Sequence, residues 1–175
     1  ATGAPMLDVI LDRAGQKGTG RWTVIEAQHL AAPVPVIEAA VMARNTSSRL
    51  GERQAGEAEY GTAPQALTPG SLSLDDLEQA MIAGKILCYA QGFAMMSEAS
   101  AGFGWTLPLP EIAKVWRAGC IIRSDMLNDM SDALSEDAAR NLMLAPFFAA
   151  RIKAGLPALR RVVAAGALNG LAVPA

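Results

Sequence analysis

The stretch from Leu74 to Met96 limits most strongly how this chain can fold. Apolar side chains recur there at helical spacing on two stripes instead of one. The stripes are Leu77, Met81, Cys88 and Met95, and Ile82, Ile86, Tyr89, Phe93 and Met96. A helix that is apolar on most sides needs neighbours on most sides, so we expect this one to lie buried in the domain.

Signals at both ends of this stretch support a helix. Ser73 precedes it, and the run S-L-D-D places Asp76 where its side chain can reach back to the cap. Gly102 and Gly104 follow where the helix should end.

The rest of the chain also has helical patterns and no convincing β alternation. Leu7, Ile10, Leu11 and Ala14 follow a helical repeat, and Gly15 stands at the position of a left-handed cap. Further helices are expected over residues 23–30, 35–56, 110–134, 141–154 and 157–169. Half of the residues are hydrophobic (51%) and only 5% are aromatic, a balance that favours helices. We therefore predict an all-α, multi-helix domain.

Composition argues against several classes of function. A net charge of −2 supplies no basic field for nucleic acid, and no apolar run reaches the roughly 18 residues that a membrane span needs. Cys88 and Cys120 lie in apolar helical patterns and are expected to be buried, reduced thiols. His29 has no ligand-like neighbours, so no metal site is expected. These observations favour a cytoplasmic protein with no nucleic-acid or membrane partner.

A glycine-rich segment, A-G-Q-K-G-T-G-R-W-T at residues 14–23, resembles two nucleotide motifs without matching either. Arg21 and Trp22 stand where a P-loop has lysine and serine or threonine, and Thr23 replaces the third glycine of a dinucleotide fingerprint. The segment also follows a predicted helix, whereas a P-loop follows a strand. A nucleotide cradle is therefore not expected here.

The same segment suits a smaller anion. Glycines let backbone N–H groups converge, Lys17 adds a positive charge, and Thr19 adds a hydroxyl donor. Arg44 lies on an otherwise apolar helical face, where it needs either a carboxylate partner or an anion. A solvated turn with an incidental lysine is the alternative interpretation of the glycine-rich segment.

Five motifs in order carry a resemblance to a known family. They are AGQKGTGRWT, ARNTSSRLGER, KILCYAQGFAMM, WRAGCIIRS and LRRVV. Together they resemble the C-terminal helical domain of 6-phosphogluconate dehydrogenase, the decarboxylating enzyme of the pentose phosphate pathway, from about Leu7 to the last residues. The resemblance implies that residues 1–175 are a partial C-terminal substrate-binding and dimerisation domain without the Rossmann cofactor domain.

The resemblance implies a site and a reaction. Lys17, Thr19 and Arg44 match the residues that hold the substrate phosphate, and the family oxidises 6-phosphogluconate with NADP, or NAD in some members, to ribulose 5-phosphate. The family's catalytic lysine and glutamate would precede residue 1. We therefore expect no catalytic residue in this segment, no tight cofactor binding, no turnover by the chain alone, and a homodimer.

Two departures from the family pattern are visible. Arg21 replaces a lysine that many relatives have, and RLGERQAGEAEYG differs from the usual K-D-E-R-x-x-A-S, which leaves the local helix end in doubt. A non-enzymatic helical module that dimerises or binds a partner, with a vestigial anion loop, remains the alternative function.

Overall fold

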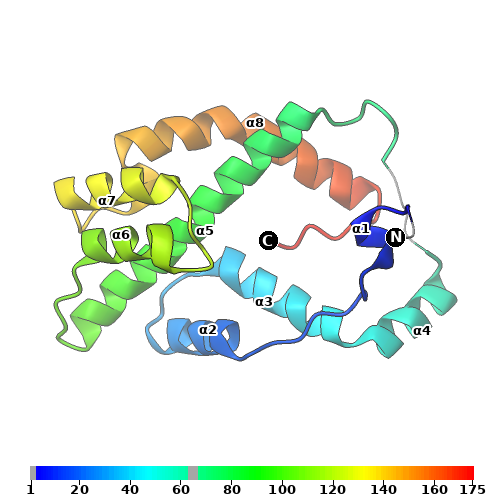
Figure 1. Ribbon diagram of the computed structural model, residues 1–175, viewed down its shortest axis with the longest axis horizontal. Coiled ribbons are helices and arrows are strands. Elements are labelled where there is room, and N and C mark those ends of the chain that lie inside the picture. Colours follow the sequence, from blue (N-terminus) through cyan, green and yellow to red (C-terminus); the bar gives the residue numbers. More distant parts are fainter. Residues whose placement is uncertain (1–2, 63–66) are drawn as a thin grey trace.

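The computed structural model describes residues 3–62 and 67–175, and within them every regular element is helical. The predicted all-α class is confirmed (Figure 1). The elements are α1 (Met6–Val9), α2 (Thr19–His29), α3 (Pro35–Ser48), α4 (Leu50–Tyr60), α5 (Leu74–Gly102), α6 (Leu109–Gly119), α7 (Met126–Glu136), a 3₁₀ turn η1 (Leu142–Leu144) and α8 (Pro146–Leu168).

Helix α5 runs through the middle of the molecule and organises its core. The long helix α8 packs along it, the α6–α7 pair covers one end, and α3 lies against its other side (Figure 1). Ile86, Tyr89 and Phe93 of α5 are buried together with Leu127 and Phe148 from the covering elements. The second apolar stripe of α5 therefore forms the core, as its spacing suggested.

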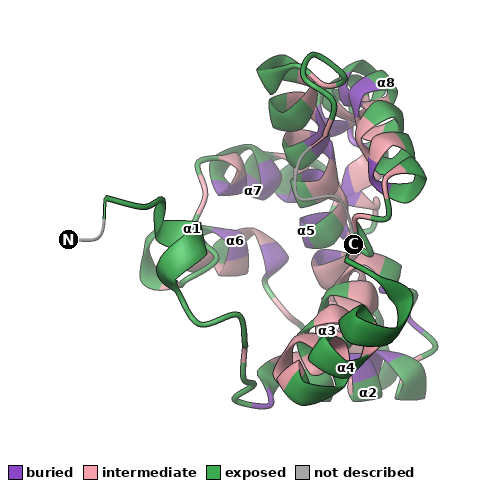
Figure 2. Ribbon diagram, turned by 90° about the vertical axis from the view of Figure 1, so that its right-hand side faces the viewer, coloured by how far each residue is buried: buried purple, intermediate pink, exposed green. Residues whose placement is uncertain are grey.

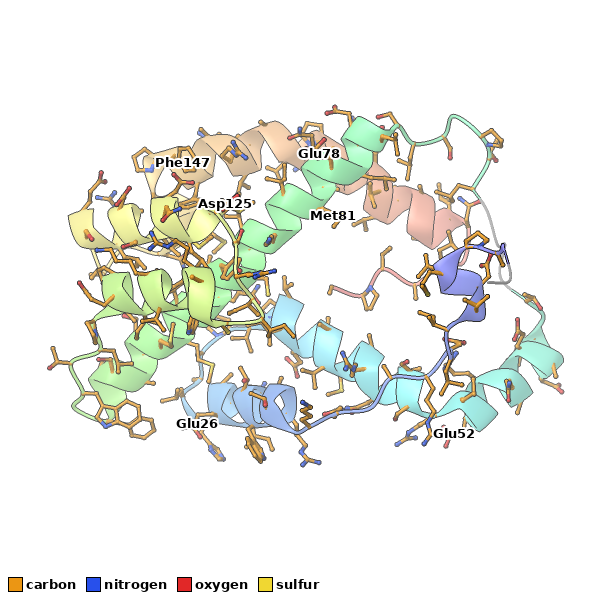
Figure 3. The ribbon with its side chains drawn as sticks, viewed as in Figure 1. Glu26, Glu52, Glu78, Met81, Asp125 and Phe147 are labelled. Carbon is orange, nitrogen blue, oxygen red and sulfur yellow. The ribbon has the colours of Figure 1, made fainter. Side chains whose placement is uncertain are left out.

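The first stripe of α5 does not behave as predicted. Met81, labelled in Figure 3, is 75% exposed. Leu77 is 41% exposed and Cys88 is also exposed. The expectation of a helix covered on most sides is wrong for this stripe, because no described element lies over it. Cys120 is half-buried, so neither cysteine is the fully buried thiol that the pattern indicated.

Several helix boundaries also differ from the prediction. The first helix ends at Val9, the chain is extended at Ile10, and Gly15 does not adopt a left-handed conformation. The predicted helix 35–56 breaks at Arg49 (φ −96°, ψ 54°) and then continues as α4. Helix 110–134 breaks at Cys120, which is extended. Figure 2 shows that α1 stands away from the core with its residues exposed, and so no packing sustains a longer helix there.

At the C-terminal end two predicted helices are one. Helix α8 passes without interruption through Pro157. An internal proline removes one hydrogen bond of the helix, but α8 packs along α5 over much of its length. This tertiary packing compensates for the lost hydrogen bond, so the proline does not end the helix.

The predicted cap of α5 is present, and it is also tied to α8. The Asp76 N–H donates to Ser73 Oγ at 3.0 Å, and the Ser73 N–H donates to Asp76 Oδ2 at 3.0 Å, which completes a capping box. Arg161 of α8 donates from Nε to Asp76 Oδ1 at 2.9 Å. The start of α5 is therefore anchored to its main packing partner.

Because of these contacts to Asp76, the free energy of unfolding should depend on pH in the acid range. The pKa of Asp76 is lowered from 3.8 to about 2, chiefly by the Ser73 N–H and then by Arg161 and the Ser73 hydroxyl. A lowered folded-state pKa contributes stability above pH 3.8 that is lost as the pH falls through about 2. We expect Asp76→Asn to flatten the pH dependence of urea unfolding in this range. Asp75→Asn, next to it and outside the box, should leave that dependence in place, and equal slopes in the two variants would contradict the assignment.

A side chain of α5 also places α3. Gln91 Oε1 accepts a hydrogen bond from the Val36 N–H at 3.0 Å, at the start of α3. The N–H groups of a first helical turn have no partner within their own helix, so this contact satisfies one of them. Since α3 carries Arg44, which contacts Gly15, the Gln91 contact connects the core to the glycine-rich segment.

Candidate anion-binding site

The glycine-rich segment begins helix α2. Gly18 has a left-handed backbone (φ +110°), and Thr19 is already the first helical residue. The Gly18 carbonyl accepts the Trp22 N–H at 2.9 Å, which closes the first turn. The prediction that the helix starts at Thr23 is therefore wrong by one turn.

The start of α2 at Thr19 affects the chemistry of the segment. The first N–H groups of α2, at Thr19, Gly20 and Arg21, have no acceptor four residues before them, and a helix N-terminus carries a partial positive charge. Such a terminus favours an anion. Residues 10–17, which precede it, form no strand, so the arrangement still differs from a P-loop.

Gly20 serves the contact between two helices. A Cβ atom at this position would lie 3.0 Å from Val41 Cγ2 on α3, closer than nearly all such contacts. Glycine therefore lets α2 lie close against α3. Val41 is one turn before Arg44, so the close approach brings the guanidinium beside the glycine-rich segment.

Arg44 is held by that segment through a backbone carbonyl. Its Nε donates to the Gly15 carbonyl oxygen at 2.8 Å, and the side chain is otherwise exposed. In residues 3–62 and 67–175, Arg44 has no carboxylate within ion-pair distance. The sequence left two possible partners for Arg44, a carboxylate or a bound anion. Among the described residues, the carboxylate is absent. The terminal nitrogens of its guanidinium make no hydrogen bond within the described part of the chain.

Lys17 and Thr19 lie on the same segment as Gly15. Both are exposed, and the Lys17 ammonium makes no ion pair or hydrogen bond with any described residue. The Thr19 carbonyl accepts from Thr23 Oγ1 at 2.9 Å, a contact inside the first turns of α2. One solvent-facing region thus combines a lysine, a threonine hydroxyl, a helix N-terminus and an arginine.

Further side chains of α3 and α4, which were not predicted, hold the segment in place. Ser47 Oγ accepts the Ala14 N–H at 3.1 Å, and the Asn45 side chain accepts a hydrogen bond from Gln16. Arg53 forms an ion pair with Asp12 at 2.7 Å. The only signal for these residues in the sequence was their place within ARNTSSRLGER.

The other candidates do not form a site. His29 is exposed and lies 3.5 Å from Glu26 on the same helix. Among the residues that the structure describes, no three metal-ligating side chains gather. None of the helices in the described ranges has the length and apolar character needed to cross a bilayer.

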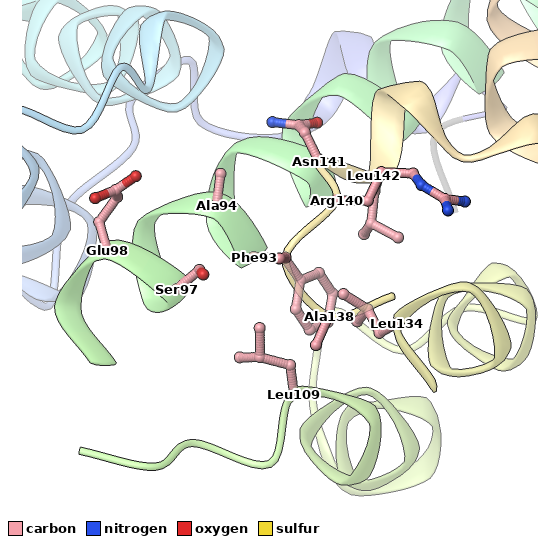
Figure 4. Close-up of a pocket in the computed structure, with 11 residues that line it drawn as sticks. Phe93, Ala94, Ser97, Glu98, Leu109, Leu134, Ala138, Arg140, Asn141 and Leu142 are labelled. Atoms are coloured by element: carbon pink, nitrogen blue, oxygen red, sulfur yellow. The ribbon is translucent and has the colours of Figure 1, made fainter. Parts of the chain in front are cut away.

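A small cavity of about 130 Å³ lies between α5, α6 and the connection before η1 (Figure 4). Phe93 and Leu109 from the core line it, together with Arg140 and Asn141. Arg140 pairs with Asp137, and Asn141 Oδ1 accepts the Met143 N–H. Lys17, Thr19 and Arg44 do not line it, so it is separate from the candidate anion site.

Comparisons with known proteins agree with the resemblance in the sequence. Residues 1–175 match the family model of the 6-phosphogluconate dehydrogenase C-terminal domain. The chain is 43% identical over 176 residues to a decarboxylating 6-phosphogluconate dehydrogenase of Schizosaccharomyces pombe, covering 99% of this chain and 36% of that protein. It is 41% identical over 177 residues to the NAD(+)-dependent decarboxylating enzyme of Bacillus subtilis, covering 99% and 38%.

A solved structure has the same fold. The 6-phosphogluconate dehydrogenase of Plasmodium falciparum, solved in its apo form, with its cofactor NADP+ and with its substrate 6-phosphogluconate, superposes with a TM-score of 0.86 at 34% identity. The match covers 97% of this chain and 37% of that one. The chain thus spans little more than a third of the length of the relatives it matches.

Proposed function

The chain belongs to the 6-phosphogluconate dehydrogenase family, whose C-terminal domain it matches over its whole length, and we propose that it supplies part of that enzyme's substrate domain. The whole enzyme would oxidise and decarboxylate 6-phosphogluconate to ribulose 5-phosphate in the pentose phosphate pathway. The observation that carries the proposal is the contact between Arg44 and Gly15, which places a guanidinium beside the glycine-rich segment.

In this proposal the substrate phosphate binds at the start of α2. Lys17 contributes an ammonium group and Thr19 a hydroxyl, while the first N–H groups of the helix point toward the anion. Arg44 is anchored through Nε, so both terminal nitrogens remain to grip two phosphate oxygens as a fork. These groups bind and orient the sugar acid, and we assign proton transfer to none of the residues described.

NADP, or NAD, would accept the hydride in the whole enzyme. This rests on the relatives, because the Plasmodium enzyme is reported with NADP+ and the Bacillus enzyme is NAD(+)-dependent. The residues that the structure describes do not fit a dinucleotide. The segment that resembles a fingerprint opens α2 after an irregular stretch instead of after a strand. We therefore expect the 175 residues alone to form no NADPH from 6-phosphogluconate, and substrate-dependent NADPH formation would contradict this.

We propose that the exposed stripe of α5 is covered by a second copy of the chain. Leu77 and Met81 line an apolar groove of about 910 Å³ together with Val163 of α8 and Val173. A patch of this kind on a surface indicates an interface. We expect sedimentation equilibrium to show a dimer that Met81→Glu dissociates, whereas Leu144→Glu, at an exposed residue outside the groove, should not.

The proposal also covers the compartment and the partners of the protein. Cys88 and Cys120 are free thiols, which supports a reducing compartment such as the cytoplasm. The net charge of −2 supports no nucleic-acid partner, and we propose no membrane partner. The alternative, a helical interaction module with a vestigial loop, predicts the same dimer but no phosphate binding.

Ligand-dependent melting distinguishes the two functions. A ligand present at ten times its Kd stabilises the folded state by about 1.4 kcal/mol, which is a rise of about 4 °C in Tm for a chain of this size. We expect 6-phosphogluconate to give such a rise at saturating concentration. Gluconate, which lacks the phosphate, is the matched control and should give none. An unchanged Tm with both compounds would support the vestigial loop instead.

A further inference from the structure

We propose that Arg53 is a positioning residue for the phosphate site, acting through Asp12 and the segment that leads to Lys17. This inference rests on the proposed function of that site. Arg53 itself lies on α4, outside the group of residues that would touch the phosphate.

The segment between α1 and α2 has little structure of its own. Residues 10–17 belong to no helix, and the one backbone hydrogen bond formed between them joins the Arg13 N–H to the Leu11 carbonyl. Its path is therefore decided by contacts with other elements. Figure 1 shows it running along the junction of α3 and α4 before it reaches α2.

Arg53 supplies two of these contacts, both to Asp12. Its Nη1 lies 2.7 Å from Asp12 Oδ2, and its Nη2 donates to the Asp12 carbonyl at 2.5 Å and to the Ser47 carbonyl at 3.2 Å. The side chain is only 29% exposed, against 65% for Arg49 one turn earlier. A guanidinium can bridge three acceptors in this way because its donors form a planar fork, which a lysine lacks.

The break between α3 and α4 makes this bridge possible. Helix α3 ends at Ser48, so the Ser47 carbonyl is among the last carbonyls of the helix and has no helical N–H partner. The non-helical backbone of Arg49 redirects the chain into α4. Arg53 then satisfies the Ser47 carbonyl and Asp12 at once.

Three successive contacts connect Arg53 to the candidate site. Arg53 holds Asp12, Ser47 Oγ holds the Ala14 N–H, and Arg44 holds the Gly15 carbonyl. Lys17 follows two residues later. Both terminal nitrogens of Arg53 donate to the chain. Those of the exposed Arg44 make no hydrogen bond with a described residue. Loss of the contact between Arg53 and Asp12 would release residues 10–17. The Gly15 carbonyl, which orients Arg44, would be released with them.

The decisive experiment removes the acidic partner. Titration calorimetry with 6-phosphogluconate would compare the chain with its Asp12→Ala variant. By charge alone, deleting a carboxylate near the site should strengthen the binding of an anion. If Arg53 positions the segment through Asp12, the opposite is expected, and the Kd should rise about tenfold. This is the effect of losing about one hydrogen bond to a charged group. An unchanged or lower Kd in Asp12→Ala would overturn the proposal.

Arg53→Ala provides a second, independent measurement. We expect it to raise the Kd about tenfold as well. Arg49→Ala is the matched control, since it removes the same charge from the same region, but among the described residues the Arg49 side chain pairs with Glu52 alone. Equal effects of the two arginine variants would assign the loss to net charge and overturn positioning. Melting without ligand checks that each variant is folded, and if Arg53→Ala fails to fold, Asp12→Ala still decides.

Combination with Arg44→Ala separates this inference from the proposed function. If Arg53 acts by orienting Arg44, Arg53→Ala should cost much less affinity when Arg44 is already alanine. If the loss of affinity in the double variant equals the sum of the two single losses, Arg53 does not act by orienting Arg44. If Arg44→Ala alone leaves the Kd unchanged, the proposed phosphate site fails and the positioning role fails with it. If Arg44→Ala weakens binding while Asp12→Ala does not, only the positioning role fails.

Discussion

Replacing Lys17 and Arg44 together with alanine should weaken the binding of 6-phosphogluconate by about a hundredfold. A hydrogen bond to a charged group contributes about 1.5 to 3 kcal/mol, and two such contacts at the low end total about 3 kcal/mol. This corresponds to roughly two factors of ten in Kd. The effect should be nearly additive only if the two side chains grip the phosphate independently, so the single variants belong in the same calorimetric series.

The matched control for this double variant is Lys153→Ala with Arg160→Ala. Both side chains are exposed and belong to α8. Helix α8 lies on the opposite side of the molecule from α2 (Figure 1). The net charge falls equally in the two double variants, so a general electrostatic effect would weaken binding equally. If only the Lys17 and Arg44 double variant loses affinity, the two side chains contact the phosphate directly. Because both residues are exposed, Tm without ligand should hardly change.

A second large effect is expected where α5 and α8 cross. Gly155→Val should lower the free energy of unfolding by about 3 kcal/mol, and Tm by about 8 °C. A Cβ atom at Gly155 would lie 2.9 Å from the Gln79 carbonyl oxygen and 3.0 Å from Ala83 Cβ. Neither neighbour can rotate away, so the helices must separate. Valine has a higher helix propensity than glycine, but the difference of a few tenths of a kcal/mol is much smaller than the cost of the clash.

The contrasting substitution is Gly56→Ala in α4. No atom lies within 4 Å of a Cβ built there, so the methyl group meets open space. Alanine removes the entropic cost of a helical glycine, and the chain should become more stable by about 0.5 to 1 kcal/mol. Urea unfolding of both variants measures the difference. Destabilisation of similar size at both glycines would show that helix approach is not what Gly155 provides.

The proposed phosphate site shows how much of a site the local sequence can suggest. Lys17, Thr19 and Arg44 could be proposed from the sequence because their side-chain chemistry and the motif around them are local properties of the chain. Asn45, Ser47 and Arg53 were not, since hydroxyl, amide and guanidinium groups on a polar helix face have many possible partners. Asp12 and Arg53 are 41 residues apart, and only folding makes them neighbours.

The helical class, the cap at Ser73 and the end of α5 near Gly102 could all be predicted from the chain alone. Each depends on backbone preferences and on residues within about one helical turn. The passage of α8 through Pro157 and the choice of which α5 stripe is buried came from packing. Those outcomes depend on the free energy of contacts between distant elements, which exceeds local propensities of a few tenths of a kcal/mol per residue.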